Sequence, residues 1–272
     1  MTATKQRIDF IDLAKGVCIL LLAIGHCGIN TGIPGYIWVA VPLFFVISGL
    51  FFKNYDKLRD MWINKINRLL IPFFFFYFTA YLCFYALKWF MPNMLVTASE
   101  GICNIFYNRQ FFNGPIWFIL CLFWCNILFG IICWYVSAEW QRIAIVLWGG
   151  SLALEQFTDT RLSMHYNKIE GWATWPISLI SVVSMIYLCK AVRSLPFITN
   201  VGRYSIVILC VHHMIYRPLI VLFSRIPMPE SISTAWLVAL VTILISALCI
   251  PIFKRYLPWA IAQKDLLVIK DK

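Results

Sequence analysis

Long runs of apolar residues alternate along the chain with short polar segments, and the runs have the length of membrane-crossing helices. A helix needs roughly 20 apolar residues to cross the hydrocarbon core of a bilayer, so the pattern predicts about eight transmembrane helices. Seven or nine remain open, because the fifth run is short and contains Gly149 and Gly150. We expect an all-α, polytopic helix bundle that forms one domain over residues 1–272. The predicted spans are 10–29, 34–52, 69–90, 115–135, 143–157, 173–190, 204–223 and 235–253.

The composition supports this class of protein. Of the 272 residues, 61% are hydrophobic and 13% are charged, and the mean hydropathy is +0.79. Soluble domains carry about 25% charged residues, so this chain has too few to cover a water-soluble globule. It is predicted to be an integral membrane protein. Most of the ten cysteines lie inside apolar runs, and none has the spacing of a zinc site, so we expect no metal.

The formal charge of +11 comes from basic residues that cluster between the apolar runs. Lysine and arginine concentrate on the cytoplasmic side of membrane proteins, so topology explains this charge better than a nucleic-acid partner. The bias places both termini in the cytoplasm. The lysines and arginines that then fall outside are Lys88, Arg109, Arg161, Lys168, Arg217 and Arg225.

The first span contains three polar residues, Asp12, Lys15 and His26, that are unusual at membrane depth. On a helix, Lys15 and His26 lie within about 20° of one face and roughly 16 Å apart, and Asp12 is close enough to pair with Lys15. Ionisable residues inside a membrane usually face the bundle interior and mark function. The alternative is a lysine that extends to the headgroups and a histidine hydrogen-bonded near the outer interface.

Two further segments carry candidate chemistry. PLFFVISG, residues 42–49, begins with proline and ends in Ser48 and a glycine, which favours either local unwinding or close helix packing. KINRLLIP, residues 65–72, enters the third span from the cytoplasm. Its Lys65 and Arg68 belong either to an ordinary basic cytoplasmic loop or to a clamp for the phosphates of an anionic ligand.

In this order, the segment from Asp12 to His26, PLFFVISG and KINRLLIP resemble the acyltransferase 3 family of bacterial membrane acyltransferases, and more narrowly its fucose 4-O-acetylase-like branch. The segments GPIWF (114–118) and GRYSI (202–206), the latter leading to His212, are similar to later motifs of that branch. The resemblance extends over about residues 7–260, and its first fifty residues are the specific part. The family core commonly has ten helices, so this chain is shorter, mainly between 140 and 190.

The resemblance implies transfer of an acetyl or other acyl group from cytoplasmic acetyl-CoA to a sugar hydroxyl of a surface glycan or its lipid-linked precursor. The implied location is the bacterial plasma (inner) membrane. Expected partners are the acyl-CoA donor, the sugar acceptor and the lipid bilayer; a homo-oligomer and a glycan-synthesis complex stay open. By motif, Lys15 takes the basic place, His26 the catalytic place and His212 that of the late histidine. Lys65 and Arg68 match the cytoplasmic basic pair.

A sugar hydroxyl is a poor nucleophile at neutral pH, so the reaction needs a base, and histidine suits that task. We expect His26 to take the acceptor's proton, with an acyl-histidine intermediate as the less favoured route. Asp12 would orient Lys15 toward the donor. Ser48 is a candidate oxyanion donor, against the alternative of helix packing, and His212 is either catalytic or structural. Two other classes remain: a transporter or flippase for a glycan or small solute, and an inactive scaffold of a glycan assembly complex.

Overall fold

The computed structural model describes residues 7–27, 36–53, 55–87, 113–135, 174–225 and 234–268. Within these ranges the chain forms helices and turns and no strand, which confirms the all-α prediction for this part of the protein. The elements are α1 (Asp9–His26), α2 (Tyr36–Leu50), α3 (Leu58–Lys65), η1 (Ile66–Leu70), α4 (Ile71–Leu87), η2 (Gly114–Ile116), α6 (Trp117–Tyr135), α8 (Thr174–Val192), α9 (Pro196–Arg203), α10 (Ser205–Phe223) and α11 (Thr234–Tyr256).

Each predicted span except 143–157 contains a helix, and 143–157 lies outside the described residues. Within the described residues, four helical segments are long and apolar enough to cross a membrane: Leu58–Leu87, Gly114–Tyr135, Ser205–Phe223 and Thr234–Tyr256. Two shorter apolar helices cover Val39–Leu50 and Ser178–Val192. The first span differs from the four because α1 carries three charged residues, Asp9, Asp12 and Lys15. The count of eight spans and the cytoplasmic termini stay predictions.

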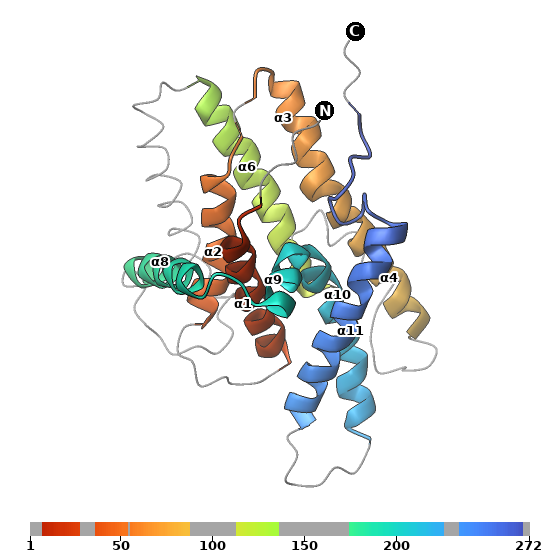
Figure 1. The fold of residues 1–272 in the computed structure, drawn as a ribbon. Coiled ribbons are helices and arrows are strands. Elements are labelled where there is room, and N and C mark those ends of the chain that lie inside the picture. The colour runs from red at the N-terminus through yellow and green to blue at the C-terminus, as the bar shows by residue number, and fades with distance from the viewer. Residues whose placement is uncertain are drawn as a thin grey trace.

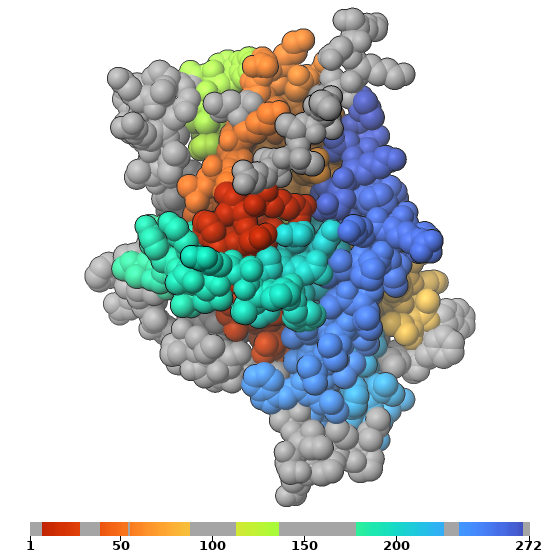
Figure 2. All heavy atoms as spheres, in the orientation of Figure 1, coloured from red at the N-terminus to blue at the C-terminus, as the bar shows by residue number. Residues whose placement is uncertain are grey.

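Helix α1 lies inside the bundle, in contact with α2, α8, α9, α10 and α11. Figure 1 shows α10 and α11 side by side, whereas α8 runs across α1 and α2 rather than along them. In Figure 2, α8, α9 and α11 cover one face, with part of α1 visible beside α9. Along α11 the exposed side chains form an apolar stripe, as expected where a helix faces lipid. They are Trp236, Leu240, Leu244, Leu248 and Ile252.

The third helix begins earlier than the sequence predicts. We expected a basic loop up to residue 68, but the chain is helical from Leu58 and continues through the π-helical turn η1 into α4. The reason is packing against α6: Met61 is buried, and the ring of Trp62 meets Phe123 edge-on at 6.1 Å. π-helical turns inside α-helices often occur at functional sites. Here the turn begins directly after Lys65 and contains Arg68.

Two glycines bring α1 and α9 into backbone contact. A Cβ atom on Gly202 would lie 1.7 Å from the carbonyl oxygen of Asp12, and one on Gly16 would lie 2.0 Å from the carbonyl oxygen of Ile198. Neither position has room for a side chain, so the two helices pack as closely as their main chains allow. This approach places Arg203, at the end of α9, beside the charged first turns of α1.

After α11 the chain turns back and packs on η1 and α4. We call residues 257–268 the C-terminal segment; it consists of turns and bends. Ala260 and Ile261 within it are buried, and Trp259 meets Phe75 of α4 edge-on at 5.2 Å between ring centroids. The segment is therefore part of the folded bundle, and it reaches the turn that carries Arg68.

Candidate active site

The end of α1 meets the middle of α10 through two histidines. Nδ1 of His26 lies 2.8 Å from Nε2 of His212, and the two ring planes are almost parallel, 4° apart. His212 is completely buried, whereas His26 is partly exposed. The two residues that the sequence selected from separate segments are therefore direct partners, 186 positions apart in the chain.

The partners of His212 assign the proton positions on both rings. Nδ1 of His212 lies 2.7 Å from the carbonyl oxygen of Ile208, and a carbonyl oxygen only accepts, so Nδ1 carries the proton. In a neutral imidazole the other nitrogen then accepts, so His26 donates from Nδ1 to Nε2 of His212. His26 is left with a lone pair on Nε2. The arrangement presents that nitrogen as a base.

The residues just before α6 lie against α10, next to this pair. Asn113 donates from Nδ2 to the carbonyl oxygen of Cys210 at 2.6 Å, and a Cβ atom added to Gly114 would lie 3.4 Å from Nε2 of His213. His213 is buried and meets Tyr216 edge-on at 5.0 Å. Its Nδ1 and the Oδ1 atom of Asn113 have no hydrogen-bond partner among the residues that the structure describes. The segment GPIWF, singled out in the sequence, thus borders the histidines.

At the opposite end of α1, four charged side chains form a cluster. Nζ of Lys15 lies 3.6 Å from Oδ1 of Asp12, which confirms the pairing expected from their spacing. Arg203 adds what the sequence did not predict: its Nε lies 3.5 Å from Oδ2 of Asp12 and its Nη2 lies 3.1 Å from Oδ1 of Asp9. Asp12 is buried and shared between two cations. Lys15 and His26 therefore mark the two ends of one helix.

A second polar group forms where α2, α3 and α6 meet. Lys65 donates from Nζ to Oδ1 of Asn126 at 2.8 Å, and its ammonium lies 4.6 Å from the ring centroid of Phe52. Asn126 also donates to the carbonyl oxygen of Leu122 at 2.7 Å. Asn126 is buried, and sequence reasoning missed it. The available signal was an amide inside an otherwise apolar helix, since a buried polar group needs partners.

Ser48 belongs to this second group. Its Oγ lies 2.9 Å from Nδ2 and 3.1 Å from Oδ1 of Asn126. Helix α2 continues through Pro42 to Leu50, so the unwinding considered from the sequence does not occur in the described part of that helix. Among the contacts in the described ranges, none joins Ser48 to His26. Its role as an oxyanion donor stays a prediction, and its hydrogen bonds favour the packing alternative.

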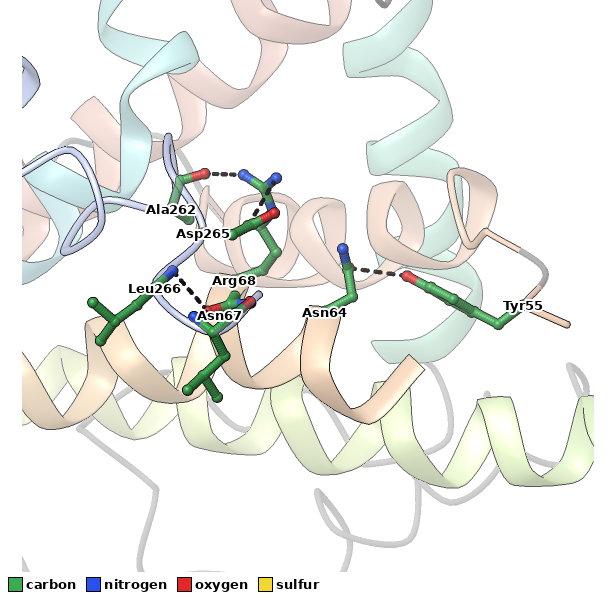
Figure 3. A network of polar contacts seen from close by, with 8 residues as sticks. Tyr55, Asn64, Asn67, Arg68, Ala262, Asp265 and Leu266 are labelled. Atoms are coloured by element: carbon green, nitrogen blue, oxygen red, sulfur yellow. Dashed lines mark hydrogen bonds and ion pairs between the residues drawn. The ribbon is translucent and has the colours of Figure 1, made fainter. Parts of the chain in front are cut away.

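Arg68 contacts the C-terminal segment. Figure 3 shows its guanidinium between the carbonyl oxygen of Ala262, to which Nη1 donates, and Asp265, whose Oδ1 lies 3.3 Å from Nη2. The two basic residues of the sequence motif therefore have different partners. Lys65 bonds Asn126 inside the bundle, and Arg68 bonds the C-terminal segment. Whether both bind one anionic ligand stays a prediction.

A comparison with known protein families identifies the family of this chain. A family model described as an acyltransferase domain, that of the acyltransferase 3 family, matches residues 8–158, more than half of the chain. The matched range includes Lys15, His26, Lys65 and Arg68, and it ends before His212. No curated protein and no solved structure matches the chain. With a family match of this length and apolar helices able to cross a bilayer, the chain belongs to the acyltransferase 3 family of membrane acyltransferases.

Proposed function

We propose that this protein transfers an acetyl group from cytoplasmic acetyl-CoA to a sugar hydroxyl of a surface glycan or its lipid-linked precursor, in the bacterial plasma membrane. The observation that carries the proposal is the His26–His212 pair, which leaves a basic nitrogen on His26. Family membership supports acyl transfer in general. The order of the motifs favours a sugar acceptor, through the resemblance to the fucose 4-O-acetylase-like branch.

In the proposed reaction, the oxygen of the acceptor hydroxyl attacks the thioester carbonyl while Nε2 of His26 takes the proton of that hydroxyl. The new C–O bond forms and the C–S bond breaks, and the leaving CoA sulfur receives the proton from His26. One histidine thus serves as base and then as acid, and the proton balance closes without a further group. The alternative route forms an acyl-histidine first, followed by attack of the hydroxyl.

The donor is proposed to enter from the side of the basic residues. Lys15 lies at the opposite end of α1 from His26, at a distance of roughly 16 Å along an ideal helix. Lys15, with Asp12 as its partner, and Lys65, with Asn126 as its partner, supply the positive charge for the anionic parts of the donor. The acceptor then approaches His26 from the outer side.

His212→Leu tests whether His212 holds the tautomer of His26. Leucine cannot accept from Nδ1 of His26, so the histidine loses the bond that holds its tautomer. We expect kcat to fall roughly 10–100-fold with KM for acetyl-CoA unchanged, by analogy with metal-binding histidines, for which loss of the orienting hydrogen-bond partner has an effect of that size. His212→Gln, whose amide oxygen can accept, is expected to recover part of the rate. Equal losses in both variants would contradict this orienting role and leave His212 a packing residue.

Asn126→Leu tests the second polar group. Leucine has a similar size but cannot accept the bond from Lys65, so the ammonium loses its position. We expect about tenfold weaker CoA binding, equivalent to about 1.4 kcal/mol, with little change in kcat. The control is Trp124→Leu, on the exposed face of the same helix. Equilibrium binding of CoA to the purified variants measures the difference, and equal affinities would contradict a donor-side role for Asn126.

The proposed function itself is tested with the purified full chain in lipid vesicles, labelled acetyl-CoA and sugar or glycan acceptors. We expect label on the acceptor. If the protein instead moves a solute across the vesicle membrane and transfers no label, a transporter replaces the enzyme. If it does neither, the scaffold alternative gains support.

A further inference from the structure

A cavity of about 310 Å³ lies where α3 and the residues before it meet the C-terminal segment. Its walls come from parts of the chain about 200 positions apart, and Asn67 joins them. Asn67 donates to the carbonyl oxygen of Leu267 at 2.8 Å and accepts from the backbone amides of Leu266 and Leu267 at 3.0 and 2.8 Å. Asn67 is buried, and Figure 3 shows it against the segment beside Arg68. The cavity is thus a built part of the fold.

The lining is polar but balanced in charge. Its carboxylates are Asp56, Asp60 and Asp265, and its one basic residue is Lys53. Two of the three carboxylates are paired with arginines at 3.3 Å, Asp60 with Arg59 and Asp265 with Arg68. Counting these arginines, three negative and three positive charges surround the space. Such an interior suits an uncharged polar group, with anionic parts at the rim.

The remaining lining residues match one kind of ligand. Asn64 and the carboxylates can accept hydrogen bonds from hydroxyl and amino groups, while Ile63, Leu267 and Val268 offer an apolar surface for a flat ring. A nucleoside has these three features. Tyr55 closes one side and donates to Oδ1 of Asn64 at 2.9 Å. Burial raises the pKa of this phenol, against the opposing effect of Arg68, so the hydroxyl stays a donor.

The rim of the cavity supplies cations for phosphates. Lys53 lines it and is exposed to solvent, and Arg68, which pairs with the lining residue Asp265, keeps 42% of its side chain exposed. Arginine binds phosphate through a planar fork and lysine as a compact charge. We propose that this cavity binds the nucleoside end of the CoA donor, with the ribose 3′-phosphate on Lys53 and Arg68 and the diphosphate left to Lys15 and Lys65. This inference rests on the proposed function, since it names the place where the donor docks.

Leu267→Trp tests the proposal, because it fills the cavity while the two backbone bonds of residue 267 to Asn67 remain. Leu266→Trp is the matched control: it is adjacent, also bonded to Asn67 through its backbone, and does not line the cavity. We expect the full-length L267W protein to bind CoA at least tenfold more weakly than wild type does. Its affinity for adenosine 3′,5′-bisphosphate should fall by a similar factor relative to wild type. L266W should bind both as wild type does. Ile63→Trp, which fills the cavity from α3, is expected to repeat the L267W result.

Acetyl-pantetheine, a donor that lacks the nucleotide, separates docking from chemistry. L267W and wild type are expected to use it at the same rate, which also shows that L267W is folded. If wild type transfers acetyl from acetyl-CoA and L267W keeps wild-type affinity for CoA, the cavity is not the docking place and the proposed function stands. If wild type transfers nothing from acetyl-CoA, the proposed function fails and this inference fails with it.

Discussion

His26→Ala is expected to lower the rate of acetyl transfer by at least a hundredfold. A positioned general base contributes about 10²–10⁴-fold to a rate, and alanine removes the nitrogen that takes the proton. CoA affinity should stay within twofold of wild type, because the basic residues proposed to hold the donor lie at the other end of α1. Initial rates with labelled acetyl-CoA and equilibrium CoA binding measure the two effects separately.

The control for His26→Ala is Cys27→Ala, which truncates the buried neighbour at the same helix end without removing a base. It should keep most of the activity. If His26→Ala retained more than a tenth of the wild-type rate, the base would have to lie elsewhere, and His212 would be next to test. Label trapped on wild-type protein but not on His26→Ala, in the absence of acceptor, would favour the acyl-histidine route.

Gly202→Ala is expected to lower the free energy of unfolding substantially, because an added Cβ atom meets backbone there at a shorter distance than at Gly16 or Gly114. The new Cβ would lie 1.7 Å from the carbonyl oxygen of Asp12 and 2.5 Å from the backbone nitrogen of Gly16, so α9 must move away from α1. Overpacking a tight contact costs about 1–3 kcal/mol, and a clash with backbone belongs at or above the upper end. We expect a lower unfolding temperature and lost activity, since Arg203 moves with α9.

Gly114→Ala is the matched control for the glycine test. Its Cβ would meet the ring of His213 at 3.4 Å, an ordinary contact, so the thermal midpoint should stay close to that of wild type. Thermal unfolding of the detergent-solubilised variants, followed by circular dichroism, compares the two. If Gly202→Ala melted like Gly114→Ala, α1 and α9 would not be in backbone contact.

Local spacing predicted the parts of the site that lie within one helix. The pairing of Asp12 with Lys15 follows from three residues of separation, and the structure contains it. The hydrogen bond between His26 and His212 joins residues 186 positions apart, and motif resemblance could select both residues but not their contact. That contact depends on how α1 and α10 pack, which no local pattern encodes.

The predicted topology also bears on Ser48. With the N-terminus predicted in the cytoplasm, a second span would end on the cytoplasmic side, which predicts that Ser48 and Lys65 share one end of the bundle. In the structure both side chains bond Asn126. The early start of α3 was missed because its polar surface resembles a loop, although Met61 packs inward. The hydrogen bonds by which Asn67 holds the C-terminal segment could not be predicted from its side chains, because Asn67 bonds the main chain of residues 266 and 267.

The hydrogen bonds between Asn67 and the main chain of the C-terminal segment affect which substitutions the protein can tolerate during evolution. Asn67 holds the segment through the backbone amides of Leu266 and Leu267 and one carbonyl oxygen, so almost any residue at 266 or 267 can be held equally well. Substitution at Asn67 would remove three hydrogen bonds that hold the segment, whereas substitutions at Leu267 would reshape the cavity wall and leave those bonds in place. The position that holds the segment is thus distinct from the position that shapes the wall, and Leu267 is where the ligand preference proposed for this cavity can change.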